Sequence, residues 1–151
     1  LQVGYQFDDI LCSHAGFSPT WLDDTFGWDG WNKSNFVELT NELYKNRLHA
    51  FNFTHGGFDP YGNHPSQGPM WIRPAALMSS NKGDNGLKKK FIQVVGHTQV
   101  NSIFDSMVAS EKSMGGRYLL IDALPSGGYV YHLDGKFYPD TIPLVEKNNK
   151  I

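Results

Sequence analysis

Two apolar segments of the sequence end in the same way, and this repetition constrains the fold more than any other feature. Phe7–Ser13 has a short apolar centre followed by His14-Ala15-Gly16, and Phe91–Val95 is followed by Gly96-His97-Thr98. Each pattern is typical of a buried strand that ends in a tight glycine turn. Ligand sites in α/β sheets form at the carboxyl ends of strands. We therefore expect His14 and His97 at one edge of a sheet, where imidazoles are well placed to bind a metal.

The rest of the sequence predicts an α/β fold with substantial β content. A helix is expected from Ser34 to about Leu48, because apolar residues recur there at helical spacing, and Tyr118–Asp122 is expected to be a third strand. Asp134-Gly135 between two short apolar runs predicts a β-hairpin over 129–138. The remaining expectations are a long ordered loop over 52–69, a short helix or extended stretch over 71–78 and a polar surface loop over 79–86.

The composition limits the classes of function. The 151 residues are enough for one domain, 1–151, and an aromatic content of 14% argues against disorder. A net charge of −2 does not suggest nucleic acid or an anionic membrane as a partner. With Cys12 as its single cysteine the chain forms no internal disulfide, which favours a reducing, cytoplasmic setting. Because the sequence begins at Leu1 and enters a strand-like segment almost at once, a trimmed product is also expected.

The two histidines alone leave two interpretations open. Imidazoles at strand ends are suited to Mn, Fe or Zn. Two histidines do not by themselves complete a metal site, so they could equally be hydrogen-bonded loop residues without a chemical role. Asp122 ends the predicted third strand and either orients a ligand histidine or stabilises a turn. His132 lies within the predicted hairpin and is expected to be structural.

A resemblance to a known family favours the metal interpretation. The segment LCSHAGFSP at 11–19 resembles the His-Gly/Ala-Gly-x-Ser segment of the phosphoprotein-phosphatase branch of calcineurin-like metallophosphoesterases, and VVGHTQV at 94–100 resembles its Gly-His-Thr-x-Val segment. Trp71-Ile72-Arg73 lies between them, where that branch places an arginine that grips the substrate phosphate. The resemblance implies that His14 and His97 bind one metal of a two-metal pair and that Arg73 holds the phosphate. It also implies half of a layered β-sandwich flanked by helices.

The sequence also departs from the family pattern. The family motifs Asp-x-His, Gly-Asp-x-x-Asp-Arg and Gly-Asn-His-Glu/Asp precede the first histidine segment, but here only a short stretch precedes it. Gly62-Asn63-His64-Pro65 follows His14 and has proline where an acid belongs, and His55-Gly56-Gly57 lacks a convincing strand before it. We interpret both as coincidences. The sequence thus predicts the C-terminal half of such a domain, with no assignable bridging carboxylate or general acid.

Two functions from different classes follow from this pattern. The first is a phosphatase fragment that acts on a phosphoprotein, a dinucleoside polyphosphate or a small phosphoester, together with a partner that supplies the missing N-terminal half. By itself such a chain is expected to bind metal weakly or not at all and to be inactive. The second is a non-catalytic binding or structural module that retains the fold without a complete site. A small enzyme with a single histidine-bound metal is a third, less favoured possibility, because neither histidine motif has a carboxylate partner nearby.

Overall fold

A computed structural model describes residues 1–53, 59–81 and 86–142, and its fold is mixed α/β, as predicted. The strands are β1 (Gly4–Phe7), β2 (Ile10–Ser13), β3 (Ile92–Gln99), β4 (Tyr118–Asp122), β5 (Gly128–Leu133) and β6 (Lys136–Thr141). The α-helices are α1 (Pro19–Phe26), α2 (Phe36–Asn46), α3 (Pro74–Ser80) and α4 (Ile103–Met114). Short 3-10 helices span Leu48–Phe51, Leu87–Lys89 and Leu124–Ser126.

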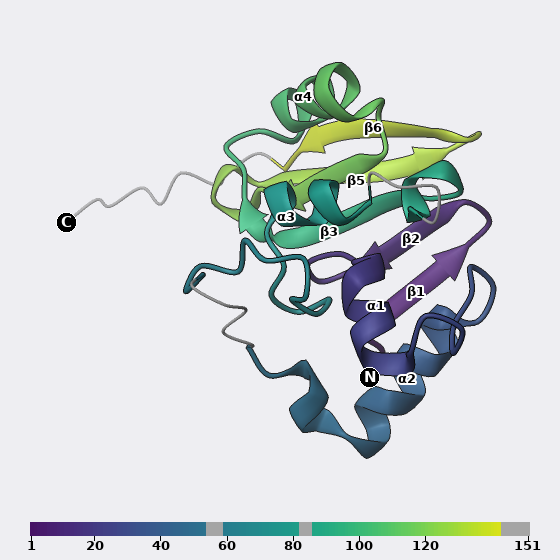
Figure 1. Ribbon diagram of the computed structural model, residues 1–151. Helices are drawn as coiled ribbons and strands as arrows, with labels where there is room; N and C mark the ends of the chain where they lie inside the picture. The colour runs from purple at the N-terminus through teal and green to yellow at the C-terminus, as the bar shows by residue number, and fades with distance from the viewer. Residues whose placement is uncertain (54–58, 82–85, 143–151) are drawn as a thin grey trace.

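The strands form a mixed sheet and a separate hairpin (Figure 1). The order in the four-stranded sheet is β1-β2-β3-β4, with β1 antiparallel to β2 and the other neighbours parallel. The chain passes through α1, α2 and α3 between β2 and β3, and through α4 between β3 and β4. Strands β5 and β6 pair antiparallel, as the Asp134-Gly135 turn predicts. The carboxyl ends of β2, β3 and β4 consequently share one edge of the sheet.

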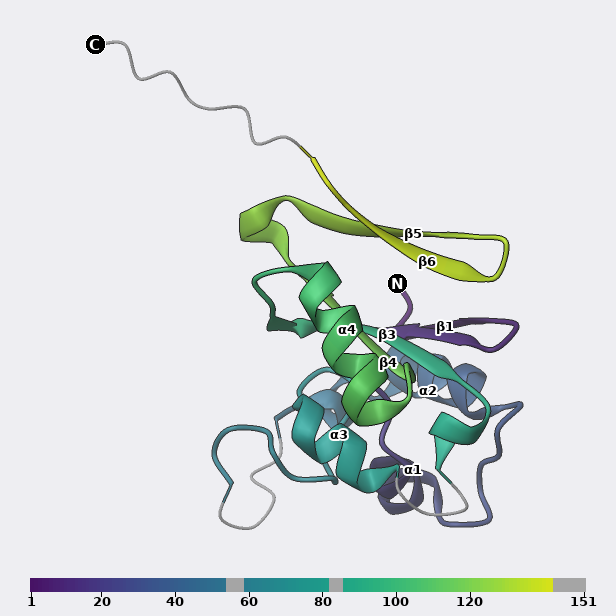
Figure 2. The ribbon, with the colours of Figure 1, turned by 90° about the horizontal axis from the view of Figure 1, so that it is seen from above.

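The two faces of the four-stranded sheet are covered differently. Figure 2 shows the β5–β6 hairpin over one face, and α1 and α3 against the other. Neighbouring residues of β2 point to opposite faces, as side chains of a strand do. Leu11 belongs to the apolar cluster of Phe17, Phe36 and Phe91 on the helical side, whereas Ile10 packs in a second cluster toward the hairpin. The sheet is therefore buried from both sides in its centre.

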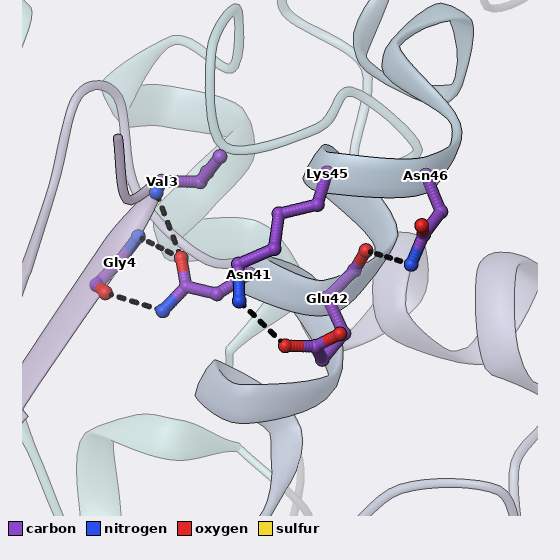
Figure 3. A network of polar contacts seen from close by, with 6 residues as sticks. All are labelled: Val3, Gly4, Asn41, Glu42, Lys45 and Asn46. Carbon is purple, nitrogen blue, oxygen red and sulfur yellow. Dashed lines mark hydrogen bonds and ion pairs between the residues drawn. The ribbon is translucent and has the colours of Figure 1, made fainter.

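Asparagine 41 of α2 closes the outer edge of β1 (Figure 3). Its Oδ1 accepts hydrogen bonds from the backbone N–H groups of Val3 at 2.8 Å and Gly4 at 3.1 Å, and its Nδ2 donates to the Gly4 carbonyl at 2.9 Å. One side chain thus satisfies backbone groups that an edge strand would otherwise expose. The same contacts fix α2 beside the sheet.

Some expected elements differ from those observed. Phe7–Ser13 is not one strand, because the chain turns at Asp8-Asp9 between β1 and β2. Asp8 has a φ of 49°, a left-handed conformation that aspartate tolerates better than most residues. Helices α1 and α4 were not predicted, although Ser18 and Ser102 cap them with side chains that accept from backbone N–H groups.

The helix expected from Ser34 is α2, which begins at Phe36. The described parts of the loop expected over 52–69 contain no helix or strand. Within the described ranges, no helix combines the length and apolar character that crossing a membrane requires.

Candidate metal centre

The fold brings His14 and His97 together at the carboxyl edge of the sheet. His14 directly follows β2, and His97 lies in the parallel neighbour β3. The Nε2 atom of His14 is 3.0 Å from the Nδ1 atom of His97, and the ring centroids are 4.9 Å apart. The backbone N–H of Gly96 also donates to the His14 carbonyl at 2.9 Å. The shared edge expected from the sequence is therefore present in the structure.

His97 has an unusual backbone conformation. The strand predicted to end at Val95 continues to Gln99, and the register between β3 and β4 shifts between these two residues. His97 lies inside this irregularity with a φ of 59°, which is uncommon for a residue other than glycine. Bulges of this kind redirect a side chain at the end of a strand, and strained residues concentrate at functional sites. The bulge places the imidazole beside His14.

A buried polar network holds the loop that follows His14. On β3, the fully buried Gln93 accepts a hydrogen bond from the Phe17 N–H at 2.8 Å and donates to the Phe17 carbonyl at 3.1 Å. Asn81 donates to the same carbonyl at 3.4 Å and to that of Leu77 at 2.8 Å. Asn81 was expected in a surface loop but is fully buried, because its amide satisfies backbone groups of the interior.

Gly16 is required in this loop for two reasons. Its φ of 118° is rarely adopted by residues with a side chain, and a Cβ atom there would lie 2.4 Å from Leu77 Cδ2. The loop therefore packs directly onto α3, which also carries the arginine of the predicted site at its start.

Arg73 contacts the segment of β3 that carries His97. Its Nη1 donates to the His97 carbonyl at 3.4 Å and to Thr98 Oγ1 at 3.3 Å, while its Nε donates to the Tyr61 carbonyl at 3.4 Å. The side chain lines a cavity of about 840 Å³ that His97 also borders. Arg73 and His97 therefore border one cavity, whereas His14 is not among its lining residues.

Sequence reasoning missed two residues of this cavity. Asn63 belongs to the Gly62-Asn63-His64-Pro65 segment that was interpreted as a coincidence, yet it lines the cavity beside Arg73. Trp71 lines it as well, with its ring edge-on to His97 at a centroid distance of 5.9 Å. His64 instead contacts Ser66 Oγ through Nδ1 at 2.7 Å. His55 lies outside the described residues.

The surroundings of His97 favour its neutral form. Burial lowers the pKa of His97, and the nearby charges of Arg73 and His14 lower it further. A hydrogen bond with the backbone of Trp71 and the negative charge of Asp122 act in the opposite direction without reversing the shift. A neutral imidazole has a lone pair available for a metal. Asp122 therefore acts on His97 through its charge. In the sheet, Asp122 is paired with Gln99 of β3.

The two imidazoles fit a metal as part of a ligand set. Two nitrogens bound to one metal at about 2.0–2.1 Å lie roughly 3–4 Å apart, and the 3.0 Å between His14 Nε2 and His97 Nδ1 lies at the short end of this range. Across the described ranges, no group of three or more His, Cys, Asp or Glu side chains is arranged to hold a metal. Asp8 and Asp9 lie at the other end of β2, and His132 contacts Phe7 there. A complete metal site would therefore need ligands from outside the described residues.

Comparisons with known proteins give no match: no family model, no curated protein and no solved structure is similar to this chain. Its function therefore has to be inferred from the sequence motifs, the fold and the geometry of this edge.

Proposed function

We propose that this chain is part of a metal-dependent phosphoester hydrolase. In this proposal His14 and His97 are ligands of one divalent metal, and Arg73 binds the substrate phosphate. The observation that carries it is the 3.0 Å separation of two imidazole nitrogens at the carboxyl edge of parallel strands. The contact of Arg73 with the His97 carbonyl supports it, since it holds the guanidinium near His97 and arginine matches phosphate oxygens well.

The residues of this chain would bind and orient rather than complete the chemistry. A two-metal centre of Mn, Fe or Zn supplies a hydroxide nucleophile and stabilises charge on the phosphoryl group. His14 and His97 would hold one of these metals, and the backbone contact at Trp71 would orient the His97 ring toward it. Arg73 would position the phosphate beside that metal. The bridging carboxylate and the general acid belong to the N-terminal half that the family resemblance implies.

The more detailed expectations from the sequence are part of the same proposal. The four-stranded sheet and the β5–β6 hairpin would be the C-terminal half of a metallophosphoesterase sandwich, and the cellular location would be the cytoplasm. The substrate would be a phosphoprotein, a dinucleoside polyphosphate or a small phosphoester.

One observation favours the second candidate, a non-catalytic module. At 3.0 Å the two imidazoles hydrogen-bond each other, so both have a partner without any metal. A histidine pair of this kind could serve only to join β2 to β3 at the sheet edge.

Titration with Mn²⁺ separates the two candidates. Paramagnetic Mn²⁺ broadens NMR signals near its site, so under the hydrolase proposal the imidazole signals of His14 and His97 should broaden first. The ³¹P line of added inorganic phosphate should broaden through the bound metal, and Arg73→Gln should reduce this effect while leaving the imidazole broadening in place.

The exposed His49 in the 3-10 helix Leu48–Phe51 provides a control, because His49→Ala should change neither effect. Broadening that is no stronger at His14 and His97 than at His49, or that survives His14→Ala, would leave the non-catalytic module as the better account.

A further inference from the structure

The cavity beside His97 has an aromatic wall that the proposed metal chemistry does not require. Phe53 meets Trp71 edge-on with centroids 5.7 Å apart, and Trp71 meets His97 in the same way at 5.9 Å. Tyr61 lines the same space. The volume of about 840 Å³ lies in the range typical of small-molecule sites.

Trp71 presents a fixed apolar surface to this cavity. Its Nε1 donates to the Phe51 carbonyl at 2.8 Å, and its backbone N–H donates to the Gly68 carbonyl at 3.0 Å. The residue is nevertheless 39% exposed. Because the polar atom of the indole already has a protein partner, the ring carbons are the part of this side chain left for a ligand. A rigid, exposed ring inside a cavity suits a planar aromatic ligand group.

Arg73 supplies a positive charge on the same cavity. Its contacts go to two carbonyls and a hydroxyl, all neutral acceptors at 3.3–3.4 Å. In the described part of the chain, the salt bridge that forms joins Lys45 and Glu42, and Arg73 takes part in no salt bridge there. A guanidinium has five N–H donors, more than these three contacts use. The charge is therefore suited to an anion, and phosphate matches its planar fork.

We propose that this cavity binds phosphate esters of planar aromatic groups, with the phosphate on Arg73 and the aromatic ring against Trp71. Such esters would be the substrate class of the proposed hydrolase, so the catalytic role of this site rests on the proposed function. Binding itself needs no metal and can be tested separately. Asn63 and Thr98 line the cavity as further hydrogen-bonding groups for the ester.

Phenyl phosphate and cyclohexyl phosphate form a matched pair of probes, because they carry the same charge on rings of similar size and only one ring is aromatic. Calorimetry on the metal-free chain should give about tenfold tighter binding of phenyl phosphate, in line with the strength of stacking on aromatic side chains. Trp71→Leu should abolish this preference, and Trp71→Phe should keep most of it. Arg73→Gln should weaken both ligands by about tenfold or more.

Trp28 supplies the control variant, since it is 81% exposed and does not line the cavity. Trp28→Leu should leave both affinities unchanged. Equal affinity for the two probes, or a preference that survives in Trp71→Leu, would overturn the proposal.

A second measurement guards against misfolding of the leucine variant. In the unmodified chain, the Trp71 indole NMR signal should shift with phenyl phosphate and much less with cyclohexyl phosphate. Similar shifts with both probes would contradict the proposed stacking. These affinities decide the aromatic phosphate site whatever the outcome of the Mn²⁺ titration, which tests the proposed hydrolase separately.

Discussion

His14 Nε2 lies 3.0 Å from His97 Nδ1, although the two histidines are 83 positions apart in the sequence. The rings meet because β2 and β3 are parallel neighbours, with Ser13 paired to Val95 just before the edge. The bulge with positive φ at His97 then turns its ring toward His14. The distance therefore depends on the sheet register and on the loop that follows β2, and both can be tested.

Zinc should bind this chain weakly and through the two histidines. Two imidazoles without a carboxylate are half of a typical ligand set, so calorimetry should give a Kd weaker than about 1 μM. His14→Ala and His97→Ala should each remove the remaining binding, while His49→Ala should not. Tight binding that persists in both single variants would show that other side chains form the site.

Replacing Gln93 should destabilise the loop that presents His14. Gln93→Leu would leave the buried N–H and carbonyl of Phe17 without this partner, which should lower the free energy of unfolding by about 2–4 kcal/mol. Urea denaturation measures the change. Gln99→Leu is the control, because Gln99 lies exposed on the same strand and should alter stability by less than about 0.5 kcal/mol. Equal losses in both variants would show that the Phe17 contacts contribute little.

The strands next to the site were the most predictable part of the fold. Phe91–Val95 and Tyr118–Asp122 are mainly apolar, as expected for strands buried in a parallel sheet. The shared pattern of an apolar segment followed by a glycine turn also placed His14 and His97 at one edge. The hairpin at Asp134-Gly135 followed from local turn chemistry alone.

The features of the fold and the site that were not predicted depend on contacts between residues far apart in the sequence. Strand β1 has four residues and an outer edge closed by Asn41, which no local pattern reveals. The burial of Asn81 depends on Phe17, 64 positions away. Trp71 and Asn63 meet at the cavity only because the loop before α3 folds back toward His97. The caps of α1 and α4 were visible as serines but lacked a long periodic stripe behind them.

Asn41→Ala should loosen α2 from the sheet. The variant removes three hydrogen bonds to Val3 and Gly4 and exposes the edge of β1, so we expect a loss of about 1–3 kcal/mol in unfolding free energy. Asn46→Ala on the same helix is the control, since the exposed Asn46 side chain donates only to the Glu42 carbonyl one turn earlier. Faster hydrogen exchange at the Val3 and Gly4 amides, seen in Asn41→Ala and not in Asn46→Ala, would locate the effect.

This chain alone should hydrolyse p-nitrophenyl phosphate no faster than metal ions in buffer, even though the aromatic ester should bind at Arg73 and Trp71. Binding without stabilisation of the transition state gives no acceleration, and the absence of a positioned general acid alone forfeits a factor of about 10²–10⁴. Absorbance assays with Mn²⁺ or Zn²⁺ should give equal rates for the unmodified chain and for His14→Ala. Adding a polypeptide that supplies the carboxylate motifs of the family should produce turnover that His14→Ala or His97→Ala abolishes. Metal-dependent turnover by the chain itself, lost in His14→Ala, would mean that its own side chains include the bridging ligand and the acid.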